Sequence, residues 1–580
     1  MARIPDSGAA RYIPYDPPID DLFNMALQSA TMAPARSAGN SASAPGLAWS
    51  ALAVAALLAV PVVVVVSHIF MPGQGAWAHL VATVLPDYVA TTLALLLGVA
   101  VGVVVLGVST AWLVTAYRFP GQDWLQWVLI LPLAMPSYVL AYAYTDALQF
   151  AGPVQTALRE WTGWRAREYW FPPVRSTGGA IAMFSLALYP YVYLLARAAF
   201  LEQSANLIEA GRLLGGTAWG TFFRVAAPLA RPAIAAGVSL ALMETLADFG
   251  TVSYFAVETF TVGIFRAWQS MGDKVAAAQL AVLLLLFVVV LVALEQHHRG
   301  RARFHNTVSR PDRAAQLSGL RALAAGLVCS MPPVLGFVLP AGMLLHLTVT
   351  DPEPLFTGRL IELIGNSFTL SGVTACIAVG LAALLAYAAR LSGSRTVLLA
   401  KRGAALGYAL PGAVIAVGVL MPVAWLDNLV ADWMTAQFGV NTGLLLTGSI
   451  AALVYAYLVR FLAIALQTVD AGLAKIRPSM EDAARVLGHT PSATLLKVHL
   501  PMMWASMLTA GLLVFVDVMK ELPATFAMRP FNFDTLAVQA YNMAKDERLP
   551  EAAAASLVIV GVALIPLLVL SRQIAKRRSG

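Results

Sequence analysis

Charged residues are scarce in this chain. Asp, Glu, Lys and Arg together make up 12% of its 580 residues, whereas 59% are hydrophobic. Soluble globular domains carry about twice as much charge, so the composition predicts a membrane protein. The formal net charge of +7 does not indicate a nucleic-acid partner. The basic residues form short clusters at the ends of apolar runs, where they set membrane topology.

Cysteine is almost absent, and a nucleotide-binding loop is missing. Cys329 and Cys376 are the only cysteines and both lie in apolar segments, so neither a disulfide framework nor a thiolate metal site is expected. The sequence contains no Gly-x-x-x-x-Gly-Lys-Ser/Thr, the loop that cradles the phosphates of ATP. We therefore expect the chain to bind no cofactor and not to be an enzyme. Any ATP hydrolysis must come from another chain.

Long apolar runs are abundant. Several have 18 residues or more, which is enough for a helix to cross a hydrocarbon core of roughly 30 Å. The sequence therefore predicts an all-α membrane protein with about twelve spans. Their predicted centres lie near residues 58, 102, 135, 188, 245, 285, 335, 375, 415, 455, 515 and 560.

Basic clusters orient these spans. The clusters 297–304, 401–402 and 576–578 should lie in the cytoplasm, because positively charged short loops stay on that side. Both termini are then predicted to be cytoplasmic. The loop 152–175 is also rich in arginine, but counting the spans places it outside. Its tryptophans suit a segment at the membrane surface, and the alternative is a docking surface for an external partner.

The chain divides into two similar halves of six spans. The predicted parts are a flexible cytoplasmic tail (1–45), a first half (46–296), a basic cytoplasmic linker (297–320) and a second half (321–580). Such a duplication gives repeats related by an axis along the membrane normal. A substrate path would lie on that axis.

A polar segment occurs once in each half, at 201–231 and at 469–504. The first copy reads Glu209-Ala-Gly-Arg-Leu-Leu-Gly215 and the second reads Asp482-Ala-Ala-Arg-Val-Leu-Gly488. The offset of 273 (482 minus 209) also aligns Pro228 with Pro501. Each copy predicts two short helices at the cytoplasmic face, with the glycine at the turn and the proline restarting the helix of the next span. Arg212 and Arg485 can pair with the acid three residues before them.

The span after each polar segment contains two carboxylates, Glu244 and Asp248 in the first half and Asp517 and Glu521 in the second. Their i, i+4 spacing predicts that each pair stacks on one helical face. Lys520 is the one compensating charge that we identify. Two interpretations stay open. The acids, with Tyr254, can form an oxygen-rich path for a hard cation, or they can form an ion-pair cluster that locks the halves together.

The repeated segment resembles the Glu-Ala-Ala signature loop of permease subunits of binding-protein-dependent ABC importers. The matching residues are Glu209, Ala210, Gly215 and Pro228 in the first half and Asp482, Ala483, Ala484, Gly488 and Pro501 in the second. Two departures are Gly211 in place of an alanine and Asp482 in place of the glutamate, although Glu481 is next to it. The resemblance implies a type I importer fold, with these segments, including Arg212 and Arg485, as helices that couple to an ATPase.

The same resemblance implies the partners. Two copies of an ATPase subunit would bind ATP and Mg at the cytoplasmic face. A periplasmic binding protein would deliver the substrate, and the chain would lie in a bacterial inner membrane. The rival from another class is an ion-gradient-driven secondary transporter that uses the buried acids as a proton relay, which leaves the two aligned polar segments without a role.

The spans with acids narrow the resemblance. The sequences Leu-Ala-Asp-Phe-Gly-Thr (246–251) and Lys-Glu-Leu-Pro-Ala-Thr (520–525) are similar to the fused, two-half permeases of ferric-iron importers, and the similarity extends from about residue 50 to 570. Fused permeases for thiamine, polyamines and phosphonates have the same architecture. We expect no stable metal site, but transient Fe(III) contacts at Glu244, Asp248, Asp517 and Glu521, because Fe(III) prefers hard oxygen ligands.

Overall fold

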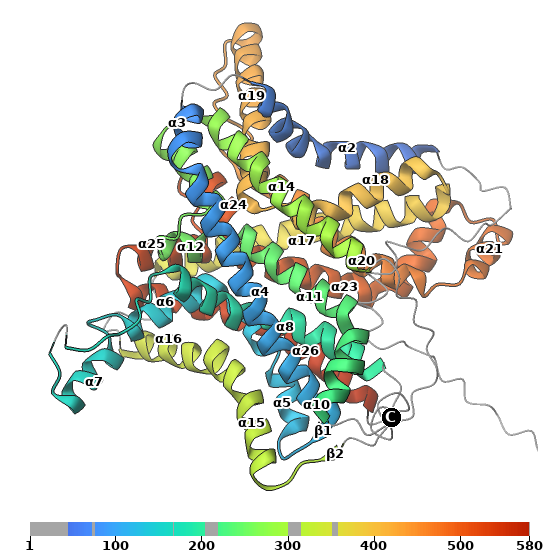
Figure 1. The fold of residues 1–580 in the computed structure, drawn as a ribbon. Helices are drawn as coiled ribbons and strands as arrows, with labels where there is room; N and C mark the ends of the chain where they lie inside the picture. Colours follow the sequence, from blue (N-terminus) through green and yellow to red (C-terminus); the bar gives the residue numbers. More distant parts are fainter. Residues whose placement is uncertain are drawn as a thin grey trace, which may run out of the picture.

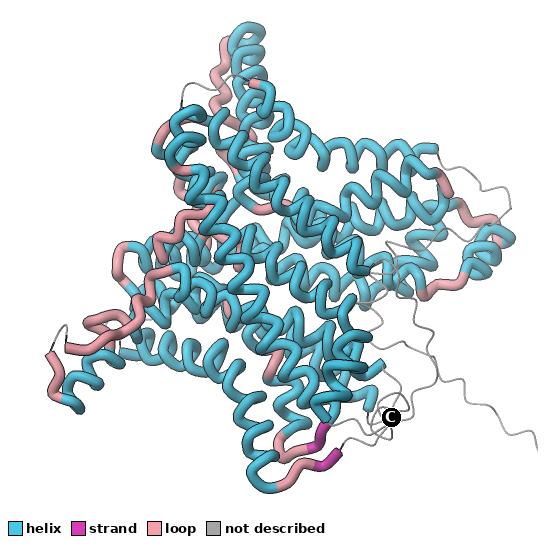
Figure 2. Tube along the Cα trace, in the orientation of Figure 1, coloured by secondary structure: helices cyan, strands magenta, loops and turns pink. Residues whose placement is uncertain are grey.

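A computed structural model describes residues 45–71, 76–165, 168–202, 218–299, 315–350 and 358–578. Within these ranges the regular structure is helical apart from two short parallel strands, β1 (Tyr117–Arg118) and β2 (Ala315–Gln316), which Figure 2 shows in magenta. The predicted N-terminal tail up to residue 44 and residues 300–314 of the predicted linker lie outside the described residues.

The twelve predicted spans correspond to helices. Eleven helices of the described chain are long and apolar enough to cross a membrane, and a bent pair, Gln122–Ala134 with Ser137–Thr162, brings the number to twelve. The eleven are Gly46–Phe70, Leu85–Ala116, Thr177–Leu201, Phe222–Ala247, Lys274–His297, Gly319–Thr350, Gly358–Ser392, Gly412–Phe438, Ile450–Ala474, Pro491–Met519 and Leu549–Leu568. The span predicted near residue 135 falls at the break in the bent pair, whose two parts meet at 92°. The all-α, twelve-span prediction is thus confirmed.

The helices of the first half run from the N-terminal side to the predicted linker (Figure 1). They are α2 (Pro45–Ser67), α3 (Ala76–Thr83), α4 (Leu85–Ala116), α5 (Gln122–Val128), α6 (Ser137–Leu148), α7 (Pro153–Thr162), α8 (Thr177–Glu202), α10 (Ala218–Thr221), α11 (Ala227–Ala247), α12 (Gly250–Tyr254), α13 (Phe260–Phe265) and α14 (Lys274–Arg299).

The second half repeats this order. Its helices are α15 (Gly319–Pro333), α16 (Leu339–Thr350), α17 (Gly358–Ser392), α18 (Arg395–Ala405), α19 (Gly412–Phe438), α20 (Ile450–Ala474), α21 (Pro478–Val486), α22 (Pro491–Thr494), α23 (Leu500–Met519), α24 (Pro523–Met528), α25 (Leu536–Lys545) and α26 (Leu549–Arg578). The fourth spans of the two halves, 177–201 and 450–474, start and end 273 residues apart.

The first span of each half packs against helices of the other half. Helix α2 packs on α17, α18 and α19 of the second half. In turn, α15 packs on α4 of the first half, and α16 packs on α6 of the first half as well as on α26 of its own. Figure 1 shows α2 beside α18 and α19, and α16 beside α6 on the far side of the molecule. One close contact explains the fit, because a Cβ at Gly418 in α19 would lie 2.5 Å from the carbonyl oxygen of Pro61 in α2. The halves are therefore interlocked.

The halves also meet where α11 and α23 end. Each of these helices is followed by a short helix, α12 or α24. A Cβ at Gly250 would lie 2.7 Å from the Leu522 side chain and 2.8 Å from that of Tyr138. Glycine thus permits the close approach of the two halves at this point.

Candidate functional site

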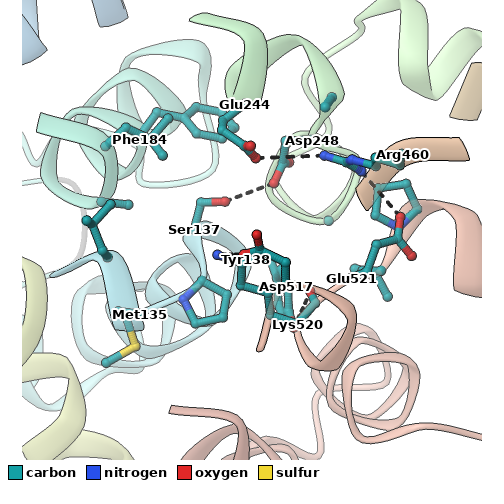
Figure 3. Close-up of a pocket in the computed structure, with 18 of the residues that line it drawn as sticks. Met135, Ser137, Tyr138, Phe184, Glu244, Asp248, Arg460, Asp517, Lys520 and Glu521 are labelled. Atoms are coloured by element: carbon teal, nitrogen blue, oxygen red, sulfur yellow. Dashed lines mark hydrogen bonds and ion pairs between the residues drawn. The ribbon is translucent and has the colours of Figure 1, made fainter. Parts of the chain in front are cut away.

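A cavity of about 100 Å³ lies between the two halves. Its lining combines side chains of α6, α8 and α11 from the first half with side chains of α20 and α23 from the second. The charged residues in the lining are Glu244, Asp248, Arg460, Asp517, Lys520 and Glu521. Figure 3 shows them around one central space. The structure therefore brings together the four predicted carboxylates and Lys520, as the two-fold arrangement of the sequence predicts.

Asp248 does not share a helix with Glu244. Helix α11 ends at Ala247, and Asp248 has an extended backbone. Its carboxylate accepts hydrogen bonds from the backbone N–H of Thr251 at 2.8 Å and from the Ser137 hydroxyl at 2.9 Å. The predicted i, i+4 stack is wrong here, because the carboxylate caps the N-terminus of α12, where free N–H groups attract negative charge.

Glu521 plays the same part in the second half. Helix α23 ends at Met519, and the Glu521 carboxylate accepts from the backbone N–H groups of Ala524 at 2.9 Å and Thr525 at 3.0 Å. The Thr525 hydroxyl adds a hydrogen bond of 2.7 Å. The stack with Asp517 is therefore also wrong. Both outer acids of the predicted pairs hold the short helices in place.

Arg460 was missed by the sequence reasoning. It lies in α20, is 7% exposed, and places its guanidinium between Glu244 of the first half and Glu521 of the second. Its Nη2 is 3.8 Å from Glu244 Oε2, and its Nη1 is 3.5 Å from Glu521 Oε1. A single arginine inside the apolar run 450–474 was the available signal, because a charge within a span usually faces a partner or a watery path.

The other two acids have close partners. The Tyr408 hydroxyl donates to Glu244 at 2.5 Å, and Lys520 Nζ is 2.8 Å from Asp517 Oδ1. The lining thus holds four carboxylates against two cations, Arg460 and Lys520. These contacts support the ion-pair interpretation that the sequence left open, without removing the excess of carboxylates.

Tyr254 lies apart from this cavity. It is not among the lining residues. Its ring packs edge-on against Tyr142, with ring centroids 4.7 Å apart. The guanidinium of Arg175 lies over the Tyr254 ring, with its Cζ 4.8 Å from the ring centroid. Within the described ranges, no three His, Cys, Asp or Glu side chains are close enough together to hold a metal ion. The carboxylates therefore stand as individual contact points around the space.

The predicted pair of short helices is only half present in the second polar segment, because α21 is short whereas α22 is the first turn of the continuous helix Pro491–Met519. Helix α21 covers Pro478–Val486, and α22 begins at Pro491 with the Thr490 hydroxyl accepting from the backbone N–H of Ala493. Gly488 has a φ of +80°, a conformation that glycine adopts without strain at the end of a helix. Figure 1 shows α21 at one edge of the molecule and α7 at the opposite edge.

Two neighbouring acids on α21 differ in their surroundings. Asp482, the residue matched to the signature glutamate, has a side chain that is 71% exposed and lies 3.6 Å from Arg485, which is the predicted pairing. Glu481 is 11% exposed in its side chain and lies 2.6 Å from Arg390 Nε on α17. Glu481, which the sequence reasoning placed beside the motif, therefore fastens α21 to the membrane helices.

Pro228 and Pro501 lie in the first turns of α11 and α23, as predicted, but the chain is helical before them as well. Pro501 follows a π-helical segment, Leu495–His499, inside a continuous helix that begins at Pro491. Pro228 follows the corresponding segment Phe222–Ala226, 273 residues earlier. No break precedes either proline, because the wider π turn lets the helix continue through a residue that lacks a backbone N–H.

The first polar segment is described only in part. Glu209, Ala210, Arg212 and Gly215 lie outside the described residues, and Pro228 lies in the first turn of α11. In the second copy, Ala483 and Arg485 are exposed on α21, whereas Ala484 is buried. The geometry of a coupling segment therefore comes from the second half alone.

Comparisons with known proteins agree with this architecture. Residues 103–303 match the family described as binding-protein-dependent transport system inner membrane component. The chain is 26% identical, over 493 residues, to the Fe(3+)-transport system permease protein FbpB 2 of Haemophilus influenzae. The aligned region covers 84% of this chain and 90% of the relative. It is 28% identical over 196 residues to the Escherichia coli molybdenum transport system permease protein ModB, covering 33% of this chain and 82% of the relative.

A further relative is named for another cargo. The sulfate transport system permease protein CysT of Escherichia coli is 28% identical over 196 residues, or 33% of this chain and 68% of the relative. These relatives are transport permeases, and the match to FbpB 2 extends over both halves. Together with the apolar helices, they identify a multi-pass permease of the inner membrane. The chain thus resembles the permeases of binding-protein-dependent ABC importers, as its repeated polar segment predicts.

Proposed function

We propose that this permease moves ferric iron into the cytoplasm. The observation that carries the proposal is the excess of carboxylates in the cavity between the halves, where Glu244, Asp248, Asp517 and Glu521 face Arg460 and Lys520. Carboxylate oxygen suits a hard cation such as Fe(III). The separate placement of the acids fits a path with transient contacts better than a site that retains the metal.

The relatives support this cargo in part. The protein that matches along most of both chains is named for Fe(3+) transport, whereas the relatives named for molybdenum and sulfate match a third of this chain. An oxyanion is the second candidate, favoured by the two cations Arg460 and Lys520 in the same cavity. Thiamine, polyamines and phosphonates stay as further alternatives for this architecture.

We infer that α21 is one of two docking points for the ATPase. Val486 is 87% exposed and Leu487 is 77% exposed at its end, and such apolar side chains on a short polar helix suit a cleft in another protein. The segment around Glu209 and Gly215 would supply the second point. Two ATPase subunits would bind ATP and Mg, and both termini of the permease would lie on the same cytoplasmic side.

Alternating access follows from these parts as a proposal. A periplasmic binding protein would deliver the cargo to the face opposite α21. Closure of the two ATPase subunits would bring the coupling segments together and shift the interlocked halves, so that the cavity opens to one side at a time. The capping acids Asp248 and Glu521 would move with α12 and α24, because their hydrogen bonds tie each acid to its short helix.

Uptake into proteoliposomes tests the proposal. The permease, its ATPase and its binding protein are reconstituted with ATP inside, and uptake of ferric iron, molybdate, sulfate, thiamine and putrescine is compared. Ferric iron is expected to accumulate and to require both ATP and the binding protein. Accumulation of molybdate or sulfate instead would favour the oxyanion, and iron uptake without ATP, driven by an ion gradient, would favour a secondary transporter.

A further inference from the structure

Arg460 is a buried arginine that is loosely held. Charge-assisted hydrogen bonds from a guanidinium are typically about 2.7–2.9 Å long, but the two contacts of Arg460 are 3.5 and 3.8 Å. Its Nε is buried and has no hydrogen-bond partner among the described residues. The arginine that crosses the cavity therefore leaves much of its bonding capacity unused.

Arg390 provides the comparison within the same half. Its Nε lies 2.6 Å from Glu481 Oε1, and its two terminal nitrogens donate to the carbonyl oxygens of Leu473 at 2.5 Å and Ile476 at 2.6 Å. Arg390 is thus held by two hydrogen bonds and one close ion pair, as a structural arginine is. Arg460 has neither short contacts nor carbonyl partners of this kind. Moving it would break much weaker contacts than moving Arg390.

Arg460 has no counterpart in the first half. The offset of 273 places Ala187 at the position of Arg460 in the first half, and Ala187 also lines the cavity. A Cβ at Gly412 would lie 2.7 Å from Glu521 Oε1 and 3.1 Å from Arg460 Nη1. In the first half Ser137, at the equivalent start of α6, instead donates to Asp248. The glycine and the arginine thus form one asymmetric feature.

We propose that Arg460 is a tethered cation that occupies the place of the cargo between Glu244 and Glu521 while the path is empty. A hard cation that enters the cavity displaces the guanidinium and takes over the compensation of both carboxylates. Because the two acids come from different halves, the exchange takes place at the interface that opens during transport. This inference rests on the proposed function, since it assumes that the cargo is a cation.

The exchange makes Arg460 a determinant of specificity. Two carboxylates that face each other without compensation would attract any small cation, because opposite charges attract strongly at short range in a site of low dielectric constant. With the guanidinium in place, a weakly attracted ion gains too little to displace it. A cation of high charge density gains more from the same two oxygens. The resident arginine would thereby exclude ions of low charge.

Binding of Tb³⁺, a hard trivalent probe, tests the exchange without requiring transport. Tyr138, Tyr191 and Tyr408 line the cavity, so Tb³⁺ bound there should show luminescence sensitised by tyrosine. In the purified permease–ATPase complex, Arg460→Met is expected to bind Tb³⁺ at least about tenfold more tightly than the wild type, because removal of one unit charge at short range has an effect of this size or larger. If no cation binds between Glu244 and Glu521, removal of Arg460 should give no gain in affinity.

Two further variants define the outcome. Arg175→Met removes the same charge outside the cavity, and its Tb³⁺ affinity should stay within about twofold of the wild type, since the distant charge is screened. Arg460→Gln keeps a hydrogen-bonding head group without charge and gives the same test should Arg460→Met fail to fold. Adding Glu244→Gln and Glu521→Gln to the Arg460 variant should abolish the gain.

The proposal is overturned when both Arg460 variants bind Tb³⁺ no more tightly than the wild type, or when the gain persists without Glu244 and Glu521. The proposed function fails independently of this result. If the complex imports an oxyanion and not ferric iron, yet Arg460→Met binds Tb³⁺ more tightly, the proposal that ferric iron is the cargo is refuted. The proposal that a cation can displace Arg460 is then still supported. Iron import with unchanged Tb³⁺ affinity refutes the displaceable cation alone.

Discussion

At the scale of single residues, the residue that matches the family signature is not the one that makes the buried contacts. Asp482 matches the family signature by its spacing to Gly488, but its side chain is 71% exposed. Its neighbour Glu481 is held by Arg390 and lies 3.4 Å from the buried ring of His499. Removing one partner of a buried ion pair is strongly destabilising, whereas exposed ion pairs contribute little. The two adjacent acids should therefore respond very differently to substitution.

Neutralising Glu481 is expected to destabilise the permease. Glu481→Gln leaves Arg390 without its carboxylate, and the loss of one partner from a buried ion pair costs about 3 kcal/mol. Asp482→Asn should leave stability almost unchanged, because the exposed pair with Arg485 is screened by solvent. Thermal unfolding of the purified chain in detergent measures both variants. Equal shifts in the two would contradict the assignment of Glu481 as the anchoring acid.

At the scale of elements, the sequence pattern predicted helices well and their ends less well. The apolar runs predict all the spans, because hydropathy acts on each run separately. The ends of α11 and α23 were misplaced, since Asp248 and Glu521 leave their helices to cap α12 and α24. Whether an acid caps a helix depends on where the next helix begins, and the i, i+4 spacing of the acids carries no information about that position. The π turns before Pro228 and Pro501 were missed for a similar reason, because they depend on how the packed helices continue.

The turn between α21 and α22 gives a prediction at this scale. Gly488→Val should reduce ATP-dependent uptake several-fold while ATP hydrolysis continues, because a φ of +80° is strained for a β-branched residue and α21 would be reoriented. Gly403→Val is the matched control, since Gly403 lies inside α18 with open space around it. The ratio of cargo imported to ATP hydrolysed in proteoliposomes is the measurement. An unchanged ratio in the Gly488 variant would argue against a coupling role for α21.

At the scale of the whole molecule, the exchange of first spans was beyond the sequence reasoning. Apolar spans at 46–70 and 319–350 look alike whether they pack on their own half or on the other. The choice is made by side-chain fit, such as the contact of Gly418 with Pro61, and by the hydrogen bond of the Tyr455 hydroxyl to the carbonyl of Leu57 at 2.5 Å. The site was predicted in part. The sequence repeat predicted its acids, but Arg460, the partner of Glu244 and Glu521, could be identified only from the packing of α20.

Separating the halves should show their mutual dependence. When the chain is divided within 300–314 and both parts are expressed together, they should copurify and support uptake, because α2 and α16 each pack on the other half. Gly418→Leu should weaken this association, since the side chain would meet the backbone of α2. Gly342→Leu, at a position in α16 with open space around it, is the control. Copurification that is unaffected by Gly418→Leu would indicate that α2 does not hold the halves together.

The exchanged first span also has a consequence for biosynthesis. Helix α2 ends at Ser67, and α17, the first of its second-half partners along the chain, begins at Gly358, a separation of 358 minus 67, or 291 residues. At a synthesis rate of about 5–20 residues per second, roughly 15–60 seconds pass between the two helices leaving the ribosome. During that interval α2 can contact only lipid, helices of the first half or an insertion factor. A chain arrested before residue 358 should thus present α2 without its second-half partners, and that incomplete state is the form on which membrane quality control would act.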